Sequence, residues 1–112
     1  MTPAKPNHER RAYRRRVPKG GVRVTCQLGA LGLGPNVAVA VLDVSEGGAR
    51  LAVTAAVPPG QEVEVTFAAP TLGRPVRRMA ALVWCTPRDP GTWWAGARFD
   101  RRLPYAELTG LA

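Results

Sequence analysis

The chain has 112 residues, 46% of them hydrophobic, which is enough for one folded domain with a single core. No apolar run approaches the ~20 residues that a membrane span needs, and the basic N-terminus has no apolar segment typical of a secretory signal. We therefore expect one cytoplasmic domain. The two cysteines, Cys26 and Cys85, are expected to be buried thiols and not a disulfide, because disulfides are rare in that compartment.

Positive charge is concentrated at the N-terminus. The formal net charge is +8, and residues 1–23 hold eight basic side chains against Glu9 alone, so the rest of the chain is nearly neutral. A cationic segment of this kind repels itself and is expected to stay extended until it meets an anion. We expect residues 1–17 to form a basic arm and residues 18–112 to form the folded domain.

Short segments with strand character, separated by turns rich in Gly and Pro, follow the arm. Alternation of apolar and polar residues, or runs of β-branched residues, predicts strands at 22–28, 36–42, 49–53, 62–67, 78–86 and 93–99. Turns are expected at 29–35, 43–48, 57–60 and 87–91, and a short helix at 104–111, which begins with proline. Six strands and one helix indicate an all-β fold, a small antiparallel barrel or sandwich.

The residues needed for common catalytic chemistry are missing. His8 is the only histidine and lies in the arm, so neither Ser45 nor a cysteine has a histidine on the folded domain to activate it. One histidine and two distant cysteines do not form a zinc site, and neither the P-loop nor the dinucleotide-binding glycine motif is present. The sequence predicts a protein that is not an enzyme and needs no metal or cofactor.

Two motifs occur in order along the chain. Arg11 and Arg15 form an R-x-x-x-R motif, and residues 43–48 (DVSEGG) fit D/N-x-S-x-x-G. Together with their spacing, they resemble the PilZ domain family of bacterial receptors for cyclic di-GMP. Residues 94–99 (WAGARF) are similar to the final strand of that family. The resemblance covers about residues 9–111 and implies a six-stranded, Greek-key-like barrel with a helix near the C-terminus.

The resemblance also implies a ligand site. Arg10 and Arg14 have the same spacing as Arg11 and Arg15, so two registers are open. We prefer the register of Arg11 and Arg15, because the family commonly has an acidic residue and an arginine just before its motif, here Glu9 and Arg10. The candidate ligand-binding residues are Arg10, Arg11, Arg14, Arg15, Asp43, Ser45, Gly47 and Gly48.

The chemistry of these residue types suits a guanine nucleotide. Arginine can donate two hydrogen bonds to the O6 and N7 edge of guanine and can stack on its face. We expect Asp43 to accept hydrogen bonds from guanine or to fix an arginine, Ser45 to add a small donor and acceptor, and Gly48 to let the backbone approach the ligand. The alternative for residues 43–48 is a hairpin turn that caps its own amides.

The three tryptophans are expected to pack in the core or at the barrel rim. Trp93 and Trp94 point to opposite faces of one strand, so one of them is expected to be exposed, where it could contact a partner. The sequence thus predicts a cytoplasmic receptor that orders its arm on cyclic di-GMP and signals to a partner protein. Two alternatives remain: nonspecific binding of nucleic acid or anionic surfaces by the arm, and a PilZ-like adaptor that binds no ligand.

Overall fold

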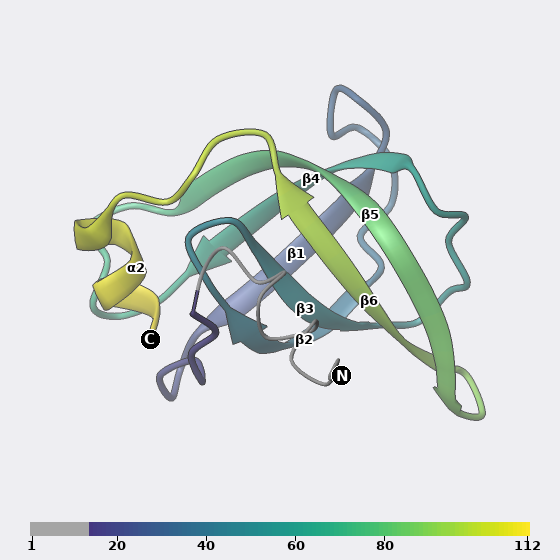
Figure 1. The fold of residues 1–112 in the computed structure, drawn as a ribbon, viewed down its shortest axis with the longest axis horizontal. Helices are drawn as coiled ribbons and strands as arrows, with labels where there is room; N and C mark the ends of the chain where they lie inside the picture. The colour runs from purple at the N-terminus through teal and green to yellow at the C-terminus, as the bar shows by residue number, and fades with distance from the viewer. Residues whose placement is uncertain (1–13) are drawn as a thin grey trace, which may run out of the picture.

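A computed structural model describes residues 14–112. Six strands form one strongly curved antiparallel sheet, and one short helix lies at one end of it (Figure 1). The strands are β1 Arg23–Leu28, β2 Ala38–Val44, β3 Gly48–Val53, β4 Gln61–Ala68, β5 Val76–Asp89 and β6 Thr92–Phe99, and the helix is α2 Tyr105–Leu111. The order across the sheet is β1-β4-β5-β6-β3-β2. The predicted six-stranded all-β fold with a C-terminal helix is confirmed.

The inner face of the curled sheet carries the core. Alternate residues of β1, β4 and the first half of β5 point inward, and Leu51, Val63 and Leu82 are completely buried in the core. Phe67 and Phe99 meet edge to face, with ring centroids 6.1 Å apart. Both contribute large apolar surfaces to the same cluster. The alternation that predicted the strands therefore reflects one buried and one outward face.

Helix α2 closes one end of the core. Leu108 and Leu111 are buried under it, and each such side chain contributes ~1.5–3 kcal/mol when fully removed from water. Arg78 of β5 is also buried, and its guanidinium donates to the Glu107 carboxylate at 2.8 Å. The ion pair ties the helix to the sheet.

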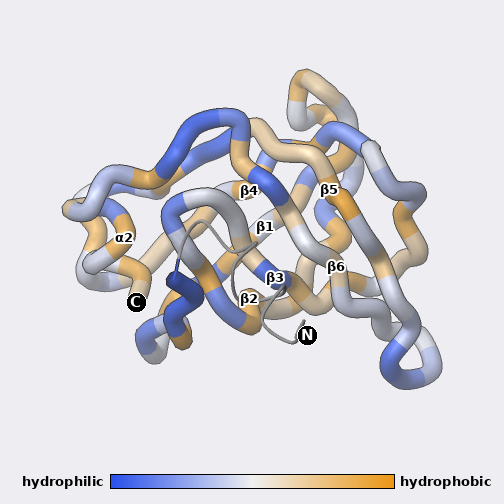
Figure 2. Tube along the Cα trace, in the orientation of Figure 1, coloured by the Kyte–Doolittle hydropathy of each residue, from blue (hydrophilic) through white to orange (hydrophobic). Residues whose placement is uncertain are grey.

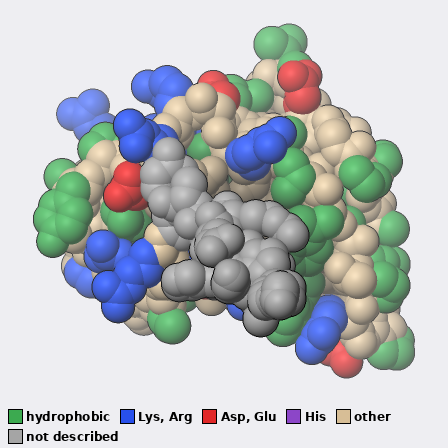
Figure 3. Space-filling model, in the orientation of Figure 1, with side chains coloured by type: hydrophobic (Ala, Val, Ile, Leu, Met, Phe, Trp, Pro, Cys, Tyr) green, Lys and Arg blue, Asp and Glu red, His purple; other side chains and the backbone are tan. Residues whose placement is uncertain are grey.

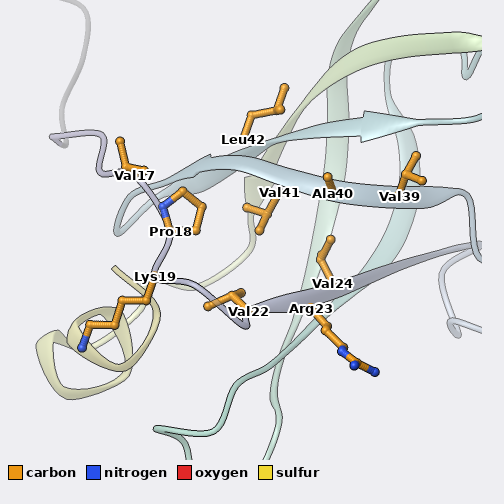
Figure 4. Close-up of a pocket in the computed structure, with 10 residues that line it drawn as sticks. All are labelled: Val17, Pro18, Lys19, Val22, Arg23, Val24, Val39, Ala40, Val41 and Leu42. Carbon is orange, nitrogen blue, oxygen red and sulfur yellow. The ribbon is translucent and has the colours of Figure 1, made fainter.

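The two edge strands, β1 and β2, meet only partly. Near one end the Val37 amide donates to the Cys26 carbonyl at 2.9 Å, and the Asn36 side chain accepts from the Cys26 amide at 2.8 Å. Farther along the strands separate, so the described part of the sheet is a half-barrel with an open seam. Val24 and Val41 point into this gap, whereas Arg23 points away from it (Figure 4).

The seam forms a groove of about 680 Å³. It is lined mainly by apolar side chains, namely Val17, Pro18, Val22, Val24, Val39, Ala40, Val41 and Leu42, with Lys19 and Arg23 beside them. Among residues 14–112, no helix is long and apolar enough to cross a membrane.

Several predicted boundaries were wrong. Asp43 and Val44 belong to strand β2 and Gly48 begins β3, so the turn between them is shorter than predicted. Strand β5 continues through Pro87 to Asp89, and the turn before β6 consists only of Pro90 and Gly91. This turn is hydrophilic and projects at the end of the molecule away from α2 (Figures 1 and 2). The long β5–β6 ribbon tolerates proline because its end has left the core and is exposed.

Candidate functional site

The last residues of the arginine-rich segment lie against strand β2. Arg16 and Val44 form an antiparallel bridge with two backbone hydrogen bonds, at 2.8 and 2.9 Å. Pro18 follows and has no N–H with which to continue the pairing. The bridge therefore places Arg15 beside the end of β2, next to Asp43.

Asp43 is the buried acidic centre of the site. It is only 8% exposed, although it lies on the outward face of the sheet. Its Oδ2 accepts hydrogen bonds from Nε and Nη2 of Arg50, at 2.9 and 2.8 Å. Arg15 Nη1 lies 3.8 Å from the same oxygen. One carboxylate thus faces two guanidinium groups and holds that of Arg50, while the expected role of Asp43 in ligand binding stays a prediction.

Sequence reasoning missed Arg50. It lies on β3 directly opposite Asp43 in the antiparallel register, so both side chains point to the same face. The signal was available in the sequence, since Arg50 is the outward residue two positions after Gly48. Arg50 could not be paired with Asp43 from the sequence, because the hairpin register depends on where the β2–β3 turn begins.

Ser45 holds the turn between β2 and β3. Its hydroxyl accepts from the Gly47 amide at 3.3 Å and lies 3.4 Å from the Gly48 carbonyl, while its own amide donates to that carbonyl at 2.8 Å. The turn that caps its own amides, which was the alternative interpretation of D-x-S-x-x-G, is therefore present. A turn built in this way can still present Ser45 to a ligand, because the side chain is only partly buried.

Gly48 has a structural reason to be glycine. A Cβ at this position would overlap the carbonyl oxygen of Ala97 on the neighbouring strand β6. The amide of Phe99 also donates to the Gly47 carbonyl at 2.9 Å, so the turn is bound tightly to β6. The absence of a side chain at Gly48 serves the close approach of two strands, and its expected role beside a ligand stays a prediction.

The other predicted site residues divide between described and undescribed parts of the chain. Arg14 and Arg15 are exposed in the structure, and only Arg15 contacts Asp43. Arg10 and Arg11 lie outside the described residues. The choice between the two R-x-x-x-R registers therefore stays a prediction. Of the arginines in the two registers, Arg15 is the one that the described structure places beside Asp43.

Cationic and aromatic side chains continue the site across β3, β6 and β5. The Arg50 guanidinium lies over the Trp94 ring at 5.2 Å, and the Arg88 guanidinium lies over the same ring at 3.9 Å. Trp84 packs across Gly96, where a Cβ would collide with its indole. Figure 3 shows more lysine and arginine than acidic side chains on the face seen in this view. An anionic, planar ligand suits such a surface.

The two cysteines are free thiols. Cys26 is completely buried, and burial raises the pKa of its thiol to about 11, whereas Cys85 is half-buried. Neither lies among the residues that surround Asp43, so neither contributes chemistry to this site. Among the described residues, no group of three or more His, Cys, Asp or Glu side chains could hold a metal ion.

Comparison with models of known protein families assigns the chain to one family. The PilZ domain model matches residues 9–108 of the 112 residues, and the chain therefore belongs to the PilZ domain family. This family is known for binding cyclic di-GMP, and its members are receptor and adaptor domains, not enzymes. The matched segment includes both motifs. No curated protein matches the chain.

Proposed function

We propose that this protein is a cytoplasmic receptor for cyclic di-GMP. The observation that carries the proposal is the buried Asp43 carboxylate at the end of β2, with Arg15 and Arg50 on the same oxygen. Two fixed guanidinium groups at the end of an arginine-rich segment suit a ligand that carries two phosphates and two guanine bases.

The arm supplies the response to the ligand. Arg16 is already bound to the edge of β2, and Arg15, which precedes it, lies close to Asp43. We propose that Arg11 and Arg15 close on the ligand and order the arm against the half-barrel. A partner protein then reads the surface that the ordered arm creates, which makes the domain an adaptor as well as a receptor.

A competing hypothesis is nonspecific binding of polyanions by the basic arm. Binding to a polynucleotide releases counterions, so log affinity falls with log salt with a slope near −0.7 to −0.9 per phosphate contacted. Cyclic di-GMP has two phosphates and no dense ion atmosphere, and stacking and base-edge hydrogen bonds are weakly screened. We expect a shallow salt dependence for cyclic di-GMP.

The two hypotheses predict changes in binding affinity of opposite sign for Asp43→Ala. In the receptor, loss of the carboxylate frees Arg15 and Arg50 from their fixed positions and weakens cyclic di-GMP binding. For a basic arm, loss of a negative charge leaves polyanion binding unchanged or slightly stronger. Calorimetric titration of both proteins with cyclic di-GMP and with a single-stranded oligonucleotide measures the sign. Equal tightening for both ligands would contradict the receptor.

A further inference from the structure

Trp94 lies on the outward face beside the proposed site. Its neighbours on β6, Trp93 and Ala95, point inward, where Ala95 is completely buried, so Trp94 points to the other face. Its partners across the sheet are Ala52 of β3 and Thr86 of β5. Because these two side chains are short, the neighbours of the indole ring on the adjacent strands are the guanidinium groups of Arg50 and Arg88.

One guanidinium connects this ring to the ligand site. Arg50 binds the Asp43 carboxylate at 2.8 Å and lies over the Trp94 ring at 5.2 Å. The acidic centre and the indole are therefore separated by the width of a single side chain.

Arg88 covers the ring without being fixed by an acid. It lies 3.9 Å over the indole, at the exposed end of the β5–β6 ribbon. Within residues 14–112, no carboxylate lies within salt-bridge distance of it. A guanidinium held only by a cation–π contact can leave one ring face and cover a base stacked there instead.

We propose that Trp94 is a stacking subsite for a guanine base of cyclic di-GMP. The base stacks on the ring face that Arg88 now covers, and Arg88 moves to the outer face of the base. Arg50 links this subsite to Asp43 by contacting both. This inference rests on the proposed function and goes beyond it, because neither sequence motif includes Trp94, Arg88 or Arg50.

The test is calorimetric titration of cyclic di-GMP into wild type, Trp94→Ala, Trp94→Phe and Arg88→Ala. Base–aromatic stacking is strong enough that Trp94→Ala is expected to weaken binding by ~10-fold or more, or to remove one ligand per chain where two are bound. Trp94→Phe is expected to be intermediate. Arg88→Ala is expected to weaken binding severalfold, and because Arg88 lies at the exposed end of strand β5, this variant keeps the fold.

Two matched variants serve as controls. Trp93→Phe changes the adjacent, inward tryptophan, and Arg74→Ala removes an equal charge from the exposed loop between β4 and β5. Both are expected to bind as wild type does, and ligand quenching of tryptophan emission is expected to persist in Trp93→Phe and to be reduced in Trp94→Phe. Circular dichroism confirms that each variant is folded.

The outcomes separate this subsite from the function. Wild-type affinity and stoichiometry in Trp94→Ala and Arg88→Ala would overturn the subsite while leaving the receptor intact. An equal loss of affinity in Arg74→Ala would show that the effect of Arg88→Ala comes from net charge, and it would also overturn the stacking subsite. Absence of binding by wild type would overturn the proposed function and this inference together.

Discussion

Replacement of Asp43 by Asn removes the charge at the centre of the site and little else. The carboxylate accepts two hydrogen bonds from Arg50, at 2.8 and 2.9 Å, and is 8% exposed. Charge-assisted hydrogen bonds contribute about 1.5–3 kcal/mol to stability. The Arg50 side chain is 35% exposed, which screens the pair and places the value at the low end. We expect Asp43→Asn to lower the free energy of unfolding by about 1–2 kcal/mol.

A double-mutant cycle isolates the pair from other effects of the substitution. Urea denaturation of wild type, Asp43→Asn, Arg50→Ala and the double variant is expected to give a coupling energy of about 1 kcal/mol. Glu46 and Arg102 provide the control cycle, since their charged atoms are 4.0 Å apart and their side chains are 42% and 67% exposed. A coupling energy for Asp43 and Arg50 no larger than that of this control pair would refute the reasoning.

Three further predictions concern the motif, the turn and the core. Arg11→Ala and Arg15→Ala are each expected to weaken cyclic di-GMP binding at least ~10-fold, because each removes a charged hydrogen-bond partner of the ligand. The urea midpoint is expected to stay unchanged. Wild-type affinity of both variants in calorimetric titration would reject the preferred register. Gly48→Ala is expected to destabilise the domain by ~1–3 kcal/mol in urea denaturation, because its Cβ would overlap the Ala97 carbonyl. The pKa of Cys26, raised to about 11 from 9.0, means that the unfolded chain loses this proton first. The free energy of unfolding should therefore fall between pH 9 and 11, by up to ~1.4 kcal/mol per pH unit. An identical fall in Cys26→Ala would show that another group is responsible.

The sequence was sufficient for the number and type of elements. Period-two alternation identified strands such as β1 and β4, which bury one face, runs of β-branched residues identified others, and Gly or Pro identified most turns. The ends of β2 and β5 were misplaced for a local reason: Asp43 and Pro87 have low strand propensity, yet both lie in strands. Tertiary contacts override their preference, through the ion pair with Arg50 for Asp43 and the exposed β5–β6 ribbon for Pro87.

The candidate site was only half visible in the sequence. Residues within one motif are close in the chain, so spacing identified Asp43, Ser45 and Gly48 together. Arg50, Arg88 and Trp94 join them through the pairing of β2, β3, β6 and β5, which periodicity does not order. The reason for glycine at position 48 is equally nonlocal, because it depends on the Ala97 carbonyl of another strand.

Calorimetric titration of the full chain with cyclic di-GMP, with GMP as the control, tests the central claim most directly. A receptor built around Asp43 and a pair of arginines needs both guanines and both phosphates of the cyclic dinucleotide. We predict saturable heat with cyclic di-GMP, little change in affinity when salt is raised severalfold, and no measurable binding of GMP at the same concentrations. Absence of saturable binding, or equal affinity for GMP, would contradict the account.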